Sequence, residues 1–114
     1  MTIVVLSGSP RKGANTDTMV DAFAQTAREG GLTVEVVRVA GKKIAGCLGC
    51  QYCFAHEGTC VQKDDMADVV ELLKRAGMVV FASPIYWFDI TAQEKAVIDR
   101  LYAFGATGFP FTKT

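Results

Sequence analysis

Short apolar runs alternate with amphipathic stretches along the chain. Three runs, at residues 3–7, 32–39 and 78–82, consist of apolar or valine-rich sequence bounded by turn residues. This length and composition are typical of strands, and the first run suits a strand buried on both faces of a parallel sheet. The pattern therefore predicts three strands.

Between and after these runs, apolar residues recur at helical spacing. The first helix is expected at 16–29, where Gly30-Gly31 ends it; the second is capped by Asp64 and ends at Gly77; the third begins with Thr91-Ala-Gln-Glu94, which has the form of a capping box. The apolar stripes are Met19, Val20, Phe23 and Ala27; Met66, Val69, Val70, Leu72 and Leu73; and Val97, Ile98 and Leu101. This alternation predicts an α/β fold, a doubly wound parallel sheet with helices on both faces, in one domain over 1–114.

The composition limits the possible functions. Half of the 114 residues are hydrophobic, and 12 basic residues balance 12 acidic ones, so the formal net charge is zero. Such a chain has no broad electrostatic surface for nucleic acid or for an anionic membrane. The N-terminal apolar run is too short for a signal peptide, and no stretch is long enough to span a bilayer. We therefore expect a cytoplasmic globular domain that binds neither nucleic acid nor membranes.

The turn after the first strand has the composition of a phosphate-binding loop. Its donors and cations, Ser7, Ser9, Arg11, Lys12, Asn15 and Thr16, lead directly into the first helix. The free N–H groups and the dipole of that helix would attract a phosphate. A nucleoside triphosphatase is disfavoured, because Ala14 and Asn15 stand where the Walker pattern needs Lys and Ser or Thr. The structural alternative is a polar turn in which Asn15 merely caps the helix.

The loop after the third strand carries three consecutive aromatic residues. It runs Ser-Pro-Ile-Tyr-Trp-Phe-Asp over residues 83–89, and Pro84 fixes the backbone where the strand ends. A planar ring system could stack on Tyr86 and Trp87. In doubly wound sheets, ligands bind beyond the carboxyl ends of the strands at the topological switch point, here the loops after the first and third strands. Alternatively, the aromatics cover the sheet edge or a subunit contact.

These features together resemble the NADPH-dependent FMN reductase family of the flavodoxin-like superfamily. The resemblance runs through most of the chain and is carried by segments 8–16, 47–66, 83–87 and 91–100. It implies that Ser7, Ser9, Arg11, Asn15 and Thr16 hold the FMN phosphate, and that Pro84, Ile85, Tyr86 and Trp87 border the isoalloxazine. The flavin itself would carry the hydride chemistry.

The chain departs from the family pattern in two respects. Glu94 stands where relatives usually have an apolar residue under the loop, and it is expected to serve the helix cap instead. The flavodoxin-like sheet has five strands, whereas three are counted here, so the fold is expected to be truncated after the third βα unit, with strand 78–82 as an open edge. We expect a partner subunit, in a homo-oligomer, or the tail 105–114 with Phe109 and Phe111, to cover this edge.

All four cysteines lie in one segment, as Cys47, Cys50, Cys53 and Cys60. Their spacing is close to the runs of thiolates that ligate iron-sulfur clusters, although the last gap is longer and no proline follows Cys60. By resemblance, iron-sulfur flavoproteins use a similar run for a 4Fe-4S cluster that exchanges electrons with FMN. Free or redox-active thiols and a tetrahedral zinc site remain open as alternatives.

Other charged residues in the second half of the chain are expected to be structural. His56 is expected to be a solvated loop residue, and Asp64 and Asp65 to form the N-cap and first turn of a helix rather than a metal pair. Lys95, Asp99 and Arg100 are one helical turn apart and are expected to form a solvated ion-pair face.

The leading hypothesis is an FMN-dependent oxidoreductase. It would pass electrons from NAD(P)H through the flavin to a second, small-molecule acceptor such as a flavin, a quinone or a nitro compound, or to an internal cluster. One alternative is a non-enzymatic electron-transfer or binding module for flavin or a cluster. Another is a degenerate fragment that binds no cofactor of its own.

Overall fold

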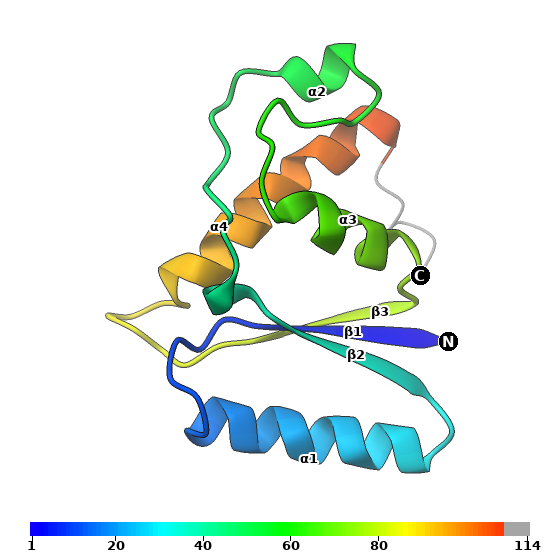
Figure 1. The fold of residues 1–114 in the computed structure, drawn as a ribbon, viewed down its shortest axis with the longest axis vertical. Helices are drawn as coiled ribbons and strands as arrows, with labels where there is room; N and C mark the ends of the chain where they lie inside the picture. Colours follow the sequence, from blue (N-terminus) through cyan, green and yellow to red (C-terminus); the bar gives the residue numbers. More distant parts are fainter. Residues whose placement is uncertain (109–114) are drawn as a thin grey trace.

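The fold is a three-stranded parallel sheet between two layers of helices (Figure 1). The computed structural model describes residues 1–108. The strands are β1 (Thr2–Ser7), β2 (Thr33–Arg38) and β3 (Met78–Ala82), in the order β2-β1-β3. In this register Ser7 lies beside Arg38 on one side and Ala82 on the other. The three predicted strands are therefore confirmed, and the central position of β1 explains its continuous apolar sequence.

Helices cover both faces of the sheet, as predicted. Helix α1 (Asn15–Glu29) lies on one face, and α3 (Met66–Lys74) and α4 (Ala92–Arg100) lie on the other (Figure 1). The short elements are η1 (Val39–Gly41), α2 (Tyr52–Ala55) and η2 (Leu101–Thr107). Crossovers of this kind join parallel strands in doubly wound folds. No helix among residues 1–108 is long and apolar enough to cross a membrane.

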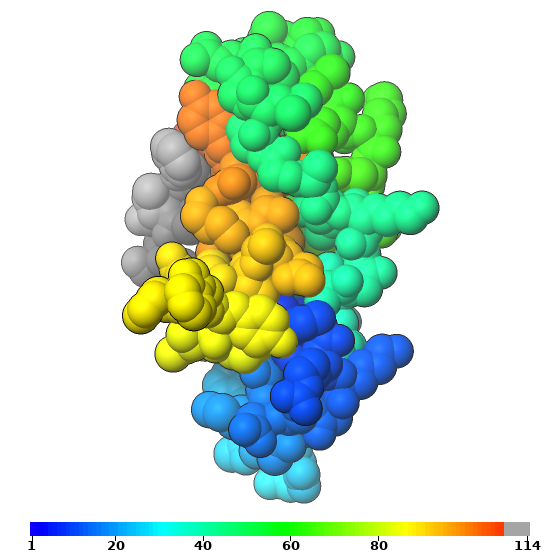
Figure 2. Space-filling model, turned by 90° about the vertical axis from the view of Figure 1, so that its left-hand side faces the viewer, coloured from blue at the N-terminus to red at the C-terminus, as the bar shows by residue number. Residues whose placement is uncertain are grey.

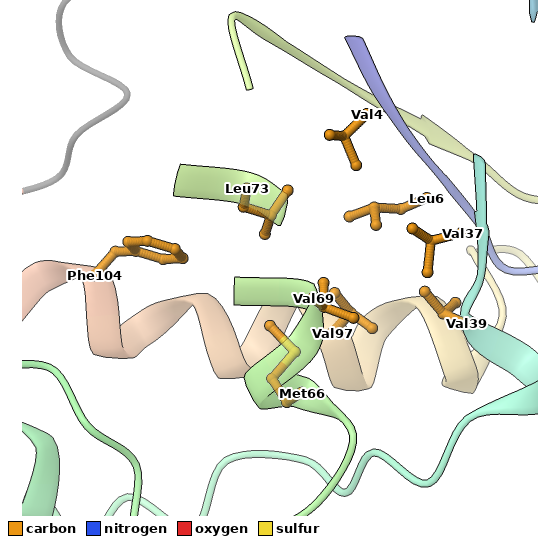
Figure 3. Packing of buried hydrophobic residues seen from close by; sticks show 9 residues of the cluster. All are labelled: Val4, Leu6, Val37, Val39, Met66, Val69, Leu73, Val97 and Phe104. Carbon is orange, nitrogen blue, oxygen red and sulfur yellow. The ribbon is translucent and has the colours of Figure 1, made fainter. Parts of the chain in front are cut away.

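Successive residues of β1 point to opposite faces and enter two separate cores. Ile3 and Val5 pack with residues of α1 and β2. Val4 and Leu6 enter the larger core beneath α3 and α4, which Figure 3 shows in detail. The full membership of that core is Val4, Leu6, Val37, Val39, Met66, Val69, Leu73, Val97 and Phe104. The period of two along a strand produces this division.

The apolar stripe predicted for α1 is partly wrong. The buried residues are Val20 and Ala24, with Ala27 partly buried, and these are three or four residues apart on one side of the helix. Met19 and Phe23 belong to the neighbouring stripe and are 72% and 39% exposed. The described part of the chain places no second helix beside α1 to cover them.

The predicted open edge is present at β3. Within residues 1–108, β3 pairs only with β1, and Met78 and Phe81 are each nearly half exposed. The tail expected to cover this edge forms η2 as far as Thr107, and η2 contacts α2. Phe109 and Phe111 lie outside the described residues. Within the described residues, the outer side of β3 is therefore open to pairing with another strand.

Candidate functional site

The loop after β1 and the loop after β3 are joined directly at the carboxyl end of the sheet. The amide N–H of Gly8 donates to the carbonyl of Ala82 at 2.8 Å, and the Thr91 hydroxyl donates to the carbonyl of Gly8 at 2.7 Å. Figure 2 shows the two loops, dark blue and yellow, side by side on one face of the molecule. From β1 the chain passes to β2 on one side of it and then returns to β3 on the other side, so the strand order reverses between β1 and β3. This is the topological switch point at which doubly wound proteins bind ligands.

The first of these loops, residues 7–16, is held closed by polar contacts. The Ser9 hydroxyl accepts a hydrogen bond from the Arg11 amide at 3.3 Å. The Asp17 carboxylate accepts the amide N–H of Gly13 at 2.7 Å and pairs with Arg38 at the end of β2. The bond from Gly13 and the contact with Arg38 lower the pKa of Asp17. The sequence alone did not assign Asp17 and Arg38 to this loop, and only the pairing of β2 with β1 brings Arg38 there.

The N-terminus of α1 has no side-chain cap. Helix α1 begins at Asn15, with Ala14 in the cap position, and its first turn bond runs from the Thr18 amide to the Ala14 carbonyl. The alternative that Asn15 caps the helix is therefore wrong, since Asn15 lies inside it. The amides that precede Thr18 have no intrahelical acceptor, and such groups favour an anion.

Ser7 adds a further hydrogen-bond donor, its hydroxyl, to this loop. Its hydroxyl is buried and has no hydrogen-bond partner among the described residues. Buried hydroxyls are normally bonded, so an orphan at a ligand-binding edge fits a group that arrives with a ligand. Arg11 and Lys12 are exposed on the same loop and add positive charge. The five residues predicted to bind the phosphate therefore lie together, along the end of β1, the following turn and the start of α1.

The loop after β3 presents its aromatic residues to solvent. Tyr86 and Asp89 exchange two backbone hydrogen bonds, at 2.7 and 3.2 Å, which closes a tight turn. Trp87 and Phe88 form the tip of this turn with φ of 44° and 77°, and each is almost fully exposed. Positive φ is unusual for large side chains, and such strain is concentrated at functional sites. The rings are thus held out at the switch point, where a planar ligand could contact them.

Thr91 and Glu94, at the start of α4, are buried beneath both loops. The Thr91 hydroxyl accepts the Glu94 amide at 3.2 Å, as a capping box predicts. The return contact is absent, because the Thr91 amide donates to the Ser83 hydroxyl at 3.0 Å. The expectation that Glu94 serves the cap is therefore wrong. Its carboxyl is fully buried without a partner among the described residues, and burial raises its pKa to about 8.

The four cysteines lie away from these loops, beside α2 and α4. Cys53 is buried, Cys60 is half-buried, Cys47 and Cys50 are exposed, and all are free. All four line one small cavity of about 20 Å³. The Cys47 and Cys60 sulfurs each accept a backbone N–H at 3.4 Å, from Gly49 and Gln62. Within residues 1–108, however, no three metal-ligating side chains come close enough together to hold a metal ion.

Arg100 anchors the cysteine segment to α4. It is 4% exposed and donates to both carboxylate oxygens of Asp64, at 2.7 and 3.0 Å, and to the carbonyl of Ala45. Its predicted place on a solvated ion-pair face is therefore wrong, whereas Lys95 and Asp99 do pair on the surface. Burial lowers the pKa of Arg100, but the contacts with Asp64 and Cys60 outweigh it, and the net pKa is raised.

Asp64 and Asp65 are structural as predicted, but Asp65 rather than Asp64 stands at the N-cap of α3, without a side-chain cap bond. Asp64 also accepts the Met66 amide at the start of α3, and Asp65 accepts the Lys43 amide, so both are structural. The bond from Arg100 lowers the pKa of Asp64. His56 is exposed, stacks on Tyr52 and contacts the Tyr52 carbonyl through Nδ1.

A parallel sheet in the order β2-β1-β3, with helices on both faces, is the flavodoxin-like arrangement. The model of the NADPH-dependent FMN reductase family matches residues 1–113, and the chain belongs to this family. An iron-sulfur flavoprotein of Archaeoglobus fulgidus is 42% identical over 105 residues, which are 92% of this chain and 47% of that protein.

Solved structures show the same fold. An NAD(P)H:quinone oxidoreductase from Methanothermobacter marburgensis superposes with a TM-score of 0.76 at 22% identity, over 92% of this chain and 54% of that one. RosB, with 8-demethyl-8-formylriboflavin-5'-phosphate bound, superposes with a TM-score of 0.74 at 21% identity, over 90% of this chain and 42% of that one. The chain thus spans about half the length of the relatives it matches.

Proposed function

We propose that this chain is the FMN-binding part of an NAD(P)H oxidoreductase that passes electrons from a nicotinamide through the flavin to a second acceptor. The observation that carries the proposal is the junction of the two loops at the switch point, where Gly8 is bonded to both Ala82 and Thr91. One loop offers donors and positive charge to a phosphate, and the other holds exposed aromatic rings for a planar ring system. Membership of the FMN reductase family agrees with this arrangement.

The residues present fit FMN. The uncapped amides of α1, the unpartnered hydroxyl of Ser7 and the exposed Arg11 would hold the phosphate, together with Ser9, Asn15 and Thr16. The strand-end segment Pro84, Ile85, Tyr86 and Trp87 would border the ring. When bound, FMN supplies the hydride and electron transfer. The chain's own contribution is to fix the phosphate and to cover part of the ring from water.

Kinetics with different acceptors and nicotinamides tests both ends of the electron transfer. Quinones, flavins and nitro compounds are all suitable small-molecule acceptors for a reduced flavin exposed at a sheet edge. We also expect a cytoplasmic location, because four free cysteines are typical of a reducing compartment. A comparison of NADPH with NADH as reductant would establish the donor.

Anaerobic stopped-flow reduction of the FMN-loaded protein tests the proposal. NADPH or NADH is expected to bleach the flavin absorption, and an added quinone is expected to restore it. A matched Trp87→Ala variant is expected to change the rate of flavin reduction, because Trp87 is proposed to contact the flavin ring. Bound flavin that neither nucleotide bleaches would contradict the reductase and favour a non-enzymatic flavin module.

A second candidate function is electron storage in an iron-sulfur cluster on the four cysteines. It is favoured by the shared cavity of the four thiols and by the N–H groups donated to Cys47 and Cys60, since hydrogen bonds to sulfur tune cluster potentials. The cysteine segment would have to close further around a cluster. Iron and sulfide analysis after anaerobic purification tests this function, and Cys53→Ser is expected to abolish any bound iron.

We propose further that β3 forms an interface with a second copy of the chain, as a homo-oligomer. The unpaired edge and the exposed Met78 and Phe81 support this arrangement, because open apolar edges pair readily. Light scattering is expected to show a species larger than the monomer, and Phe81→Lys is expected to dissociate it. A strictly monomeric wild-type protein at assay concentrations would exclude the interface.

A further inference from the structure

Beneath the proposed phosphate site lies a carboxyl group that has no structural partner. Glu94 is 0% exposed, and neither of its oxygens is hydrogen-bonded within residues 1–108. A buried charged carboxylate without a partner is very costly, so such a group is kept in its neutral, protonated form. Burial alone raises the pKa of Glu94 to about 8, which makes the neutral form dominant at neutral pH.

Glu94 is in close contact with the first glycine of the phosphate loop. A Cβ atom added at Gly8 would lie 2.3 Å from Oε2 of Glu94 and 2.7 Å from its Cβ. Gly8 therefore rests directly on the Glu94 side chain. Through Thr91, which accepts the Glu94 amide and donates to the Gly8 carbonyl, the two residues are also linked by hydrogen bonds. A change in the charge or position of the Glu94 carboxyl is therefore expected to displace Gly8 and with it the loop.

The surrounding charged groups do not neutralise this carboxyl. The charged residues of the loops and elements at this end of the sheet are Arg11, Lys12 and Asp17 of the loop and α1; Arg38 at the end of β2; Lys42 and Lys43 after η1; Asp64, Asp65 and Asp68 at the start of α3; Asp89 after β3; and Lys95, Asp99 and Arg100 on α4. The cationic Arg38 and Arg100 are committed to Asp17 and Asp64. Burial is the cause of the raised pKa, and neither Glu94 oxygen is bonded to a cation within residues 1–108.

We propose that Glu94 is a positioning residue for the phosphate loop, whose uncharged carboxyl supports Gly8 and whose ionisation weakens the binding of the FMN phosphate. The inference rests on the proposed function, in that it places a phosphate on this loop. Ionisation puts a negative charge directly beneath an anion site and forces the buried carboxylate to seek water, which displaces Gly8. The protonated form is thus the form that binds.

The expected size of the effect follows from the titration. If only the protonated form binds, the dissociation constant of FMN rises about tenfold between pH 7 and pH 9 for a pKa near 8. The phosphate itself adds no change in this interval, because the second pKa of a phosphate monoester is about 6. Riboflavin, which lacks the phosphate, is expected to show no such weakening from Glu94.

The experiment measures dissociation constants by quenching of flavin fluorescence, for FMN and riboflavin, at pH 7, 8 and 9. The variants are wild type, Glu94→Gln, which is neutral and of the same size, and Glu29→Gln on the exposed surface of α1 as a control. The tenfold rise for FMN is expected in wild type and Glu29→Gln and is expected to be absent in Glu94→Gln. Equal pH dependence in wild type and Glu94→Gln would overturn the inference.

A second measurement on the ligand-free protein keeps failure of this inference separate from failure of the proposed function. Carbon-detected NMR of the Glu94 carboxyl and the Gly8 carbonyl is expected to give one shared titration with a midpoint near pH 8. An ordinary carboxyl titration near pH 4.5, or a Gly8 signal that ignores Glu94, overturns the inference. A shared titration in a protein that binds no FMN at any pH contradicts the proposed function, and with it the coupling to phosphate.

Discussion

The stability of the protein is expected to fall with rising pH because of one residue, Glu94. Its pKa is raised from 4.5 to about 8 in the folded protein, so the folded state holds this proton more tightly than the unfolded state does. The folded state therefore binds more protons between these two values, and the free energy of unfolding decreases as pH rises through that interval. The stabilising contribution is complete below pH 4.5 and is lost by about pH 8.

The magnitude follows from the same shift. One pH unit corresponds to about 1.4 kcal/mol for a single group, so the loss over the interval approaches about 5 kcal/mol. Urea unfolding of wild type and Glu94→Gln at half-unit steps between pH 5 and 9 measures it. The free energy of unfolding of wild type is expected to fall relative to that of Glu94→Gln by about 1.4 kcal/mol per pH unit and to level off above pH 8.

The variant Glu29→Gln serves as the control, because Glu29 is exposed and its side chain accepts a hydrogen bond from the exposed Gln25 on the same helix. All other titrating groups are common to wild type and Glu94→Gln, so the difference curve isolates Glu94. Parallel stability curves for these two proteins across the whole range would refute the claim that Glu94 is buried and neutral.

Three further substitutions test the contacts that form the site. Arg100→Met is expected to cost about 1–3 kcal/mol in urea unfolding, because it removes two hydrogen bonds to the Asp64 carboxylate, and an unchanged midpoint would contradict the Arg100–Asp64 pair. Gly8→Ala is expected to cost about 1–3 kcal/mol through its clash with Glu94, and less in a Glu94→Ala background. Trp87→Ala, at an 89% exposed position, is expected to leave stability within about 0.5 kcal/mol while weakening FMN about two- to tenfold in a fluorescence titration.

Local sequence signals were sufficient for the fold of this chain. The strand runs and the helix-ending glycines place β1, β2, β3 and α1 within one residue of their observed ends. The loops after β1 and β3 meet because parallel strands bring their carboxyl ends to one edge, which the alternation of strands and helices already implies. The position of the candidate site therefore followed from topology.

The errors arose where long-range contacts decide the outcome. Arg100 lies close to Lys95 and Asp99 in the sequence of α4, a pattern typical of surface ion pairs. In the structure its side chain is instead buried, because it binds Asp64, 36 residues earlier in the chain. Glu94 has the sequence of a capping residue, yet the Ser83 hydroxyl takes the amide that it would have bonded. Helical periodicity could not distinguish the stripe of Val20 from that of Met19, because the choice depends on which elements pack against α1.

The central claim is that the loop after β1 binds the phosphate of FMN, and a titration of the purified protein with FMN tests it most directly. We expect saturable quenching of flavin fluorescence with one FMN per chain. An Arg11→Ala variant is expected to bind FMN more weakly and to bind riboflavin unchanged, because the two ligands differ only in the phosphate. No quenching by wild-type protein, or an equal loss for both ligands in the variant, would contradict the account.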